Sequence, residues 1–333
     1  MKKKIFFIEN SFDYNFLHLN SPFIGGSEKT LINISKELCK FDEFEVKVFN
    51  NTSKPVADDR LVWTNISNIS QFSNPDFLIS MSDANLLLLT NAKKNYLWSH
   101  SVQSFEKFYR KKQLLPFLKR KPIVILEGDY HFKKRNFVTS FFGKRILKLA
   151  PDYEFINTPV NENVIPDQNV IFNTRSDRNL ELIIKCWPEI KKKTPNAKLY
   201  INPPSNKKND FNINGVFIRK KGDKNDLIKD LLSSRLMINP GHVGEVFCLV
   251  AEEARELCLP IVTMGIGCLY ERVQHEKTGF IAKNENELID YSNKILNDNQ
   301  IYLDLKKNLN LMKSSRSYYN VAQDLLKILF NEK

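Results

Sequence analysis

Two glutamates, Glu245 and Glu253, stand eight positions apart in the segment GEVFCLVAEEARE, residues 244–256. Drawn as a helix, this segment has an apolar face that includes Glu253, whereas Glu252 and Glu256 fall on the opposite side. An unpaired carboxylate is costly to bury, so Glu253 needs hydrogen-bond donors from a hydroxyl-rich ligand or from a neighbouring arginine. Eight helical residues span about 12 Å, which suits two polyol rings joined by a diphosphate.

Loop residues precede these acids. Pro240, Gly241 and Gly244 interrupt the chain just before Glu245, so we expect a helix over 246–258 that begins directly after that acid. The positive end of the helix dipole would then face the phosphates between the two rings. His242, in the same loop, is a weaker candidate for contact with a ligand.

A pair of arginines provides the matching positive charge. Arg175 and Arg178 lie between a strand-like run and a helical run that Ser176 or Asp177 can cap. Two guanidinium groups beside a helix N-terminus are typical of a diphosphate clamp. Either arginine could instead be a surface charge or pair with Asp177.

The N-terminal half contributes a glycine pair and a histidine. Gly25 and Gly26 precede a predicted helix that starts near Ser27, and their backbone amides can approach a ligand closely. His100 follows the strand-like run NYLWS, where ligands of α/β proteins bind, although a lone histidine is more often structural.

These residues need a scaffold of about two domains, given a length of 333 residues. Hydrophobic residues make up 42% and charged residues 26%, as in a soluble globular protein. The sequence contains no apolar run long enough for a membrane span or a signal peptide, so we expect a cytoplasmic protein. The five cysteines include no CxxC pair and indicate neither a disulfide framework nor a zinc site.

Positive charge gathers in one window. Residues 105–148 hold thirteen lysines and arginines against three acids, within a net charge of +12. The run FEKFYRKKQLLPFLKRK, residues 105–121, interleaves cations with apolar side chains. This pattern is typical of a segment that lies on an anionic membrane or docks an anionic acceptor, and equally of a solvated helix in a lysine-rich chain.

Strand-like and helical runs alternate along the chain, which predicts α/β domains with parallel sheets. We expect an N-terminal domain over 1–160, a linker over 161–168, a C-terminal domain over 169–310, and a helix over 311–333 that packs back toward the N-terminal domain. YEFIN, residues 153–157, is predicted as a strand. Each domain should be a Rossmann-like doubly wound sheet, the two facing across a cleft, with function in the loops after strands.

The residues described above resemble the retaining nucleotide-sugar glycosyltransferases of family 4, which have the GT-B fold. The likeness rests on GGSEKTLINISKEL (25–38), on the E-x7-E spacing of EVFCLVAEE (245–253), and on CLPIVTMGIGCLYERVQHEKTGFIAKNENEL (258–288). Cys248 stands where the family usually has glycine. The likeness covers nearly the whole chain and is strongest over 169–290.

The resemblance implies a role for each candidate residue. Glu245 contacts the transferred sugar, Glu253 the donor ribose, and Arg175 with Arg178 the diphosphate; His100 lies near the transferred sugar. The donor is further bound by the glycine pair and by the residues after the first motif glutamate (Gly25, Gly26, Val246, Phe247 and Cys248). Glu245, Arg175, Arg178 and His100 are therefore the candidate catalytic residues.

The implied activity is transfer of a hexose-type sugar from a UDP- or GDP-sugar, with retention of the anomeric configuration. The acceptor is a glycan or glycolipid in surface polysaccharide biosynthesis. No metal or other cofactor is implied. Two alternatives stay open. A non-hydrolysing sugar-nucleotide epimerase shares the fold, but its acid-base carboxylates are not located in this sequence. A non-enzymatic nucleic-acid binder is suggested only by the charge, without a recognition motif, and we expect no nucleic-acid partner.

Overall fold

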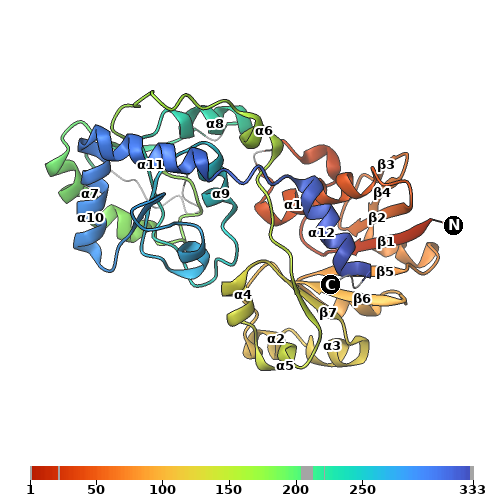
Figure 1. Ribbon diagram of the computed structural model, residues 1–333. Coiled ribbons are helices and arrows are strands. Elements are labelled where there is room, and N and C mark those ends of the chain that lie inside the picture. Colours follow the sequence, from red (N-terminus) through yellow and green to blue (C-terminus); the bar gives the residue numbers. More distant parts are fainter. Residues whose placement is uncertain (1, 22, 204–212, 221, 331–333) are drawn as a thin grey trace. The chain divides into compact units, whose positions relative to one another are not determined.

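The structure is a computed structural model that describes residues 2–330 except for 22, 204–212 and 221 (Figure 1). The chain divides into two compact units. Unit 1 comprises Met1–Leu149 together with Tyr318–Lys333, and unit 2 comprises Ala150–Ser317. The segment that we expected as a linker, 161–168, lies within unit 2.

Unit 1 is built on a sheet of eight strands in its described residues. All neighbouring strands are parallel except β3 and β4, which are antiparallel. In spatial order the strands are β3 (Val56–Asp58), β4 (Leu61–Asn65), β2 (Phe44–Asn50), β1 (Lys3–Ile8), β5 (Phe77–Met81), β6 (Lys94–Trp98), β7 (Ile123–Leu126) and β8 (Lys144–Ile146). The strand order therefore reverses between β1 and β5.

Helices connect these strands. The α-helices are α1 (Gly26–Leu38), α2 (Phe105–Arg110), α3 (Leu114–Arg120), α4 (Asp129–Lys133), α5 (Phe137–Ser140) and α12 (Tyr318–Phe330). The described part of the unit also contains 3₁₀ helices at Phe16–His18, Ile66–Gln71 and Ala84–Leu88. The central strands are buried on both faces, which explains why runs such as KIFFIE read as nearly continuous apolar stretches.

The last helix, α12, belongs to unit 1 and packs against α1 (Figure 1). Their buried hydroxyls, Thr30 Oγ1 and Tyr318 Oη, are 3.1 Å apart. Tyr96 on β6 donates a hydrogen bond to the Leu329 carbonyl at 3.0 Å. The unit is thus assembled from chain segments that are far apart in sequence.

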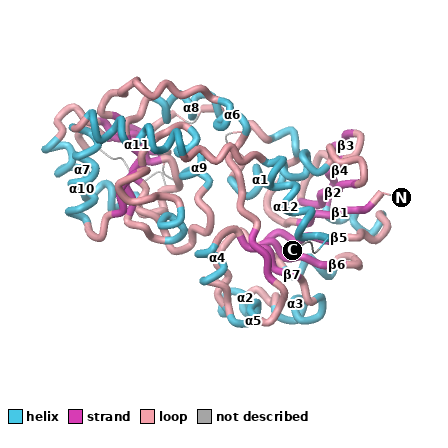
Figure 2. The backbone as a smooth tube through the Cα atoms, in the orientation of Figure 1, coloured by secondary structure: helices cyan, strands magenta, loops and turns pink. Residues whose placement is uncertain are grey.

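In its described residues, unit 2 has a sheet of six strands, all parallel. Figure 2 draws its strands in magenta. Their spatial order is β11 (Val216–Ile218), β10 (Lys198–Ile201), β9 (Asn169–Phe172), β12 (Leu236–Ile238), β13 (Ile261–Thr263) and β14 (Gly279–Ile281). This is the order 3-2-1-4-5-6 of dinucleotide-binding domains, and it reverses between β9 and β12. The predicted fold class, two doubly wound parallel-sheet α/β domains, is confirmed.

The helices of unit 2 are α6 (Tyr153–Asn157), α7 (Leu180–Lys193), α8 (Lys224–Leu232), α9 (Leu249–Glu256), α10 (Glu285–Asn297) and α11 (Asn299–Leu311), with a 3₁₀ helix at Gly267–Glu271. Along α7, Leu180, Ile183, Trp187 and Ile190 are buried at helical spacing and form the core with β9, β10 and β12. The predicted amphipathic pattern of this helix is correct.

Two local predictions are wrong. YEFIN forms helix α6 rather than a strand. Acids at its N-terminus, Asp152 and Glu154, suit the helix dipole, and both also pair with Lys224 of α8, at 2.9 Å each. Helix α7 is capped by neither Ser176 nor Asp177: it begins after Asn179, which adopts the left-handed conformation and donates a side-chain hydrogen bond to the Gly241 carbonyl at 2.5 Å. A tertiary contact therefore decides where α7 starts.

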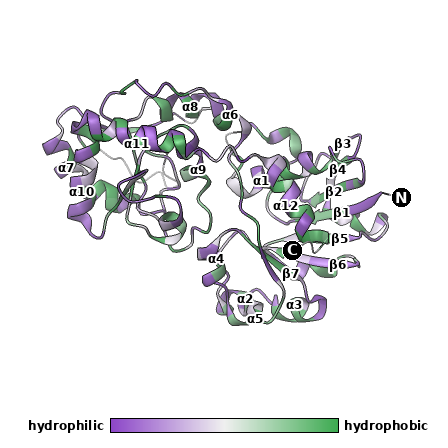
Figure 3. Cartoon of the chain, in the orientation of Figure 1, coloured by the Kyte–Doolittle hydropathy of each residue, from purple (hydrophilic) through white to green (hydrophobic). Residues whose placement is uncertain are grey.

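The basic run over 105–121 folds into the two short helices α2 and α3. Hydrophilic and hydrophobic residues are mixed along them (Figure 3). Among the described residues, no helix is both long enough and apolar enough to span a bilayer.

Candidate functional site

In unit 2, the loops after β9 and β12 meet where the strand order reverses, the position at which open α/β sheets bind ligands. Arg178 comes from the first loop and His242 from the second, and Nη1 of the arginine lies 2.5 Å from Nδ1 of the histidine. The same Nδ1 accepts a hydrogen bond from the Gly244 amide at 3.0 Å. Nδ1 therefore carries no proton, and the Arg178 side chain, only 18% exposed, is held in place at the switch point.

Glu245 lies beside this cluster. Its carboxylate is largely buried, and among the described residues its Oε2 has no hydrogen-bond partner. Burial raises the pKa of Glu245, while a hydrogen bond with Cys248 and the positive charge of Arg178 oppose the rise. An acceptor that is shielded from water and unsatisfied is costly for the fold, so Glu245 is poised to receive a hydrogen bond from a ligand.

Arg175 is placed differently. Its side chain is 68% exposed and forms two hydrogen bonds with Asp177, at 3.0 and 2.5 Å, the pairing that the sequence left open. The arginine in turn lowers the pKa of the Asp177 carboxyl. Arg175 contributes to the positive charge around Glu245 but is not locked as Arg178 is.

The helix that follows Glu245 starts later than predicted. Helix α9 begins at Leu249, and Cys248 before it has a φ of 63°, the left-handed conformation that glycine adopts most readily. The predicted helix over 246–258 is therefore wrong at its start, and also at its end, since α9 stops at Glu256 and Cys258 has a φ of 55°. The two glutamates are not joined by one continuous helix. Val246, Phe247 and Cys248 form a buried loop rather than a first helical turn.

Arg272 holds the loop of Val246, Phe247 and Cys248 in place. Its Nε donates to the Phe247 carbonyl at 2.7 Å, and its guanidinium lies 4.1 Å from the centre of the Phe247 ring. The same nitrogen is 3.2 Å from the Glu252 carboxylate. On the other side of the loop, Gly267 lies so close to the His242 carbonyl that a Cβ there would be 2.2 Å from it.

The burial of the acids on α9 also differs from the prediction. Glu252 and Glu256, expected to face solvent, are buried, and Glu253 is only half-buried. Arg255 and Arg272 pair with Glu252, and Ser314 donates to Glu256 through both its amide and its hydroxyl. The helical wheel failed here because it registers neither the pairing of Arg255 with Glu252 within α9 nor Arg272 and Ser314, which arrive from other segments.

In unit 1 the corresponding position lies at the carboxyl ends of β1, β5 and β6. A cavity of about 170 Å³ opens there, and Glu9, Tyr14, Ser27, Glu28, Ser82 and His100 are among its lining residues. Gly25 caps α1 and Gly26 is its first residue, so the predicted start at Ser27 is displaced by one position. Both glycines are exposed at the start of α1, next to the lining residue Ser27.

His100 is oriented by a carboxylate that the sequence did not single out. His100 Nδ1 is 2.5 Å from Oε1 of Glu127, and its buried Nε2 has no partner among the described residues. The close approach of the carboxylate to Nδ1 orients the ring, and the unpartnered Nε2 is available to a ligand. Nearby, His131 Nδ1 accepts from the Glu127 amide and Nε2 contacts the Ser101 carbonyl, and burial lowers the pKa of His131.

Sequence reasoning therefore missed Glu9 and Glu127, together with Arg272. Glu9 and Glu127 directly follow the apolar strands KIFFI and IVIL, at the edge where ligands bind, and that position was a usable signal. Arg272 carried no such signal, because its partners Phe247 and Glu252 lie at least twenty positions away in sequence.

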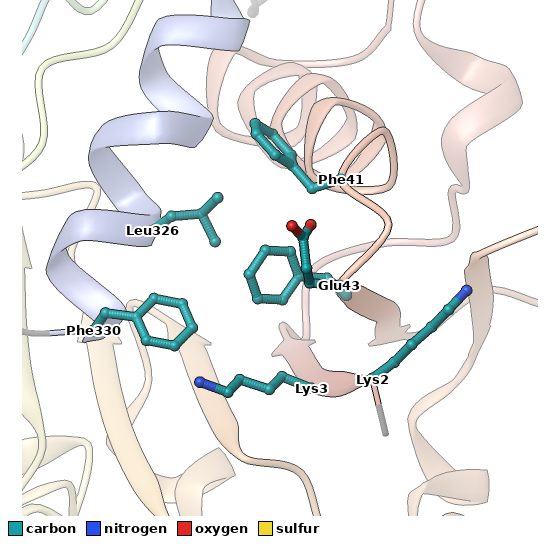
Figure 4. Close-up of a pocket in the computed structure, with 7 residues that line it drawn as sticks. Lys2, Lys3, Phe41, Glu43, Leu326 and Phe330 are labelled. Atoms are coloured by element: carbon teal, nitrogen blue, oxygen red, sulfur yellow. The ribbon is translucent and has the colours of Figure 1, made fainter.

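Another cavity, of about 630 Å³, lies at the amino ends of β1 and β2, where Leu326 and Phe330 of α12 point toward it (Figure 4). Lys3 Nζ is 4.0 Å from the centre of the Phe330 ring, and Phe41 stacks on Tyr319 at 5.7 Å. These contacts attach α12 to the unit.

Among the described residues, no group of three or more His, Cys, Asp or Glu side chains is arranged to hold a metal ion.

Known proteins resemble this chain in sequence family and in fold. Residues 170–312 match the family model described as "Glycosyl transferases group 1". No curated protein sequence matches the chain significantly.

Solved structures match over both units. Anabaena HepE in complex with UDP-glucose has a TM-score of 0.71 and 16% identity, covering 98% of this chain and 99% of its own. WaaG, a glycosyltransferase involved in lipopolysaccharide biosynthesis, has a TM-score of 0.72 and 11% identity, with 98% and 99% covered. Sucrose-phosphate synthase from Thermosynechococcus elongatus has a TM-score of 0.70 and 14% identity, with both chains covered completely. The chain therefore has the GT-B fold, and its second unit carries the sequence pattern of the group 1 glycosyltransferases.

Proposed function

We propose that the protein is a retaining, metal-independent hexosyltransferase of the family 4 type, which uses a nucleotide diphosphate sugar as donor. The observation that carries the proposal is the cluster of Arg178, His242 and Glu245 at the switch point of unit 2. It combines a fixed guanidinium with a buried, unsatisfied carboxylate, inside the region that matches the glycosyltransferase model. A donor diphosphate and a sugar hydroxyl supply the two partners that these groups need.

Arg178 is the proposed principal contact of the donor diphosphate. Its charge is held at a fixed position, so it need not be reorganised as negative charge develops on the leaving diphosphate. Arg175, on the same loop, joins it by exchanging its present partner Asp177 for a phosphate oxygen. The proposed stabilisation of the leaving group therefore comes from guanidinium groups and requires no metal ion.

Glu245 is the proposed contact of the transferred sugar, and Glu253 that of the donor ribose. These two roles are proposed on the resemblance. Val246, Phe247 and Cys248, the buried loop between the two acids in the chain, are proposed as donor contacts on the same resemblance. Retention of configuration follows the usual account for such enzymes, in which the leaving phosphate helps to deprotonate the acceptor on the same face.

The roles of Gly25, Gly26 and His100 in donor binding are proposed on the same resemblance. The Glu127 carboxylate would keep His100 Nε2 as an acceptor for a sugar hydroxyl. UDP-glucose is the first donor to test, because the similar HepE structure contains it. The proposed acceptor is a glycan or glycolipid of surface polysaccharide biosynthesis, and WaaG, of similar fold, acts in lipopolysaccharide biosynthesis.

We also propose that unit 1 contacts an anionic membrane surface, in keeping with a glycolipid acceptor and a cytoplasmic, peripheral location. Phe105 and Tyr109 on α2 and Phe137 on α5 are exposed, and the Phe105 and Phe137 rings lie 4.9 Å apart, so the two helices form one apolar patch. Phe141 follows α5 and is 82% exposed. The patch lies within the 105–148 window of thirteen lysines and arginines, and each cation near the surface adds about 1 kcal/mol of attraction to anionic lipid.

The membrane proposal is tested by co-sedimentation with vesicles of phosphatidylcholine, with or without phosphatidylglycerol. Wild type should sediment only with the anionic vesicles, and Phe141→Ser should reduce that fraction. Phe12→Ser, at a residue of unit 1 that is also exposed, is the matched control. Equal sedimentation with both kinds of vesicle contradicts the proposal.

The main proposal is tested by isothermal titration with UDP, GDP and UDP-glucose, followed by product analysis with lipid-extract acceptors. A nucleotide at 100 times its dissociation constant should add about 2.7 kcal/mol to the free energy of unfolding. Arg178→Ala should abolish binding, whereas Lys192→Ala on the exposed face of α7 should not. Conversion of the sugar nucleotide without an acceptor would support an epimerase instead.

A further inference from the structure

The cavity of unit 1 has a chemical character of its own. It lies between the carboxyl ends of β1 and β5, where the strand order of this sheet reverses, so it occupies the unit's own ligand-binding position. Its volume of about 170 Å³ is below the 300 Å³ or more of pockets for drug-sized ligands. It therefore has room for one ring rather than for an oligosaccharide.

Glu9 is the central group of this cavity. Its side chain is only 6% exposed, and its Oε2 accepts a hydrogen bond from the Ser11 amide at 2.7 Å. The other oxygen, Oε1, is buried and forms no hydrogen bond of good geometry with the described residues, although the polar side chains of Tyr14 and Asn50 lie near the carboxylate. Because an unsatisfied buried acceptor is costly, Glu9 indicates a ligand that brings a hydrogen-bond donor.

The surrounding groups define the charge of that ligand. Glu28 also lines the cavity, and the described lining residues include no lysine or arginine. Tyr14 keeps its hydroxyl proton, because burial and the carboxylates of Glu9 and Glu28 raise its pKa. The hydroxyls of Tyr14, Ser27 and Ser82 can both donate and accept. The cavity thus favours hydroxyl or amino groups and repels anions.

We propose that this cavity is the acceptor subsite and that it holds a single neutral or amino sugar ring, with a ring hydroxyl or ammonium donating to Glu9 Oε1. The assignment rests on the proposed glycosyltransferase function. It excludes hexuronic acids and sugar phosphates as the ring that occupies the cavity. Glu9 is then a specificity-determining residue for the acceptor.

The test uses three probes of the same ring: methyl glucoside, methyl glucosaminide and methyl glucuronide, titrated into the full chain and followed by ligand-observed NMR. The glucoside and the glucosaminide should bind, and the glucuronide should bind at least tenfold more weakly. Glu9→Gln keeps the shape but removes the charge, and should weaken glucosaminide binding about tenfold, the lower limit for a hydrogen bond to a charged group. Glu106→Gln, at a carboxylate whose side chain is 85% exposed, is the matched control and should change affinity less than about twofold.

A second variant covers the possibility that Glu9→Gln does not fold. Ser27 is exposed at the start of α1, so Ser27→Leu should be tolerated and should fill the cavity, abolishing binding of both sugars. The proposal is overturned if the glucuronide binds as well as the glucoside, if none of the three binds, or if neither variant weakens binding.

UDP titration, carried out in parallel, separates the two proposals. Normal UDP binding without sugar selectivity removes only the acceptor subsite. If wild type binds neither UDP nor GDP, the proposed function itself fails. UDP affinity should be the same in wild type and Glu9→Gln, and a joint loss of UDP and sugar binding in that variant contradicts a separate acceptor subsite.

Discussion

Replacing Glu245 by glutamine should have opposite effects on stability and on donor binding. The carboxylate is buried, Oε2 has no partner among the described residues, and its pKa is raised by burial. A carboxyl whose pKa is higher in the folded than in the unfolded state destabilises the fold once it is ionised. Glu245→Gln should therefore stabilise unit 2 at neutral pH while it weakens binding of the donor sugar.

The magnitudes follow from the structure. An unsatisfied buried acceptor costs about 1–3 kcal/mol, and since glutamine keeps one acceptor oxygen we expect a gain of about 1 kcal/mol. In a domain of this size, that gain raises the melting temperature by about 2–4 °C. A hydrogen bond to a charged group contributes about 1–2 kcal/mol more to binding than one between neutral groups. Affinity for UDP-glucose should therefore fall roughly 5- to 30-fold.

The stability effect also has a defined pH dependence. Below the unfolded pKa of glutamate, about 4.3, the carboxyl is protonated in both states, and the stabilising difference from Gln should be small. As pH rises through the higher folded pKa, wild type loses stability that the variant keeps, so the gap between their melting temperatures should widen and then level off.

The assays are calorimetric melting at pH 4 and pH 7 and isothermal titration with UDP-glucose. Glu189→Gln, on the exposed face of α7, is the matched control and should change neither quantity. The reasoning is refuted if Glu245→Gln lowers the melting temperature at pH 7, because the carboxylate would then be a structural group. Unchanged UDP-glucose affinity would equally remove Glu245 from the donor site.

Three further predictions concern the residues around the site. Arg178→Lys keeps the charge but loses the planar fork that contacts His242, so UDP affinity measured by titration should fall about tenfold; wild-type affinity would contradict the clamp. Arg272→Met removes one of the two arginine partners of buried Glu252 and leaves Arg255 in place. The free energy of unfolding, measured in urea, should fall by up to about 3 kcal/mol. A change below about 0.5 kcal/mol would show that the pair of Arg272 with Glu252 is not needed for stability. Glu127→Gln weakens the interaction that orients the His100 ring, so kcat should fall about tenfold while UDP affinity stays constant. A change in UDP affinity alone would argue against a role of Glu127 in orienting His100.

Much of the scaffold could be read from the sequence because it depends on local patterns. Apolar runs such as KIFFIE and the periodic apolar positions of α7 predict strands and helices, and their alternation predicts doubly wound parallel sheets. The same patterns locate the loops that carry Arg178, His242 and Glu245, since ligand-binding loops of such sheets follow the strands.

The sequence alone could not settle the burial and pairing of individual charges. Glu252 was expected in solvent and is buried because Arg255 and Arg272 reach it, and α9 starts at Leu249 because the loop before it is packed against the backbone of Gly267 and held by Arg272.

The sequence by itself determined the fold class and which kinds of polar and charged side chain follow the strands. Both can be read from the pattern of a few neighbouring residues. Only the tertiary structure decided that Arg178 is locked onto His242 while Arg175 is exposed, that Glu127 orients His100, and that Glu9 keeps one oxygen unsatisfied. Each of these depends on atoms from segments far apart in the chain, whose meeting no local pattern encodes.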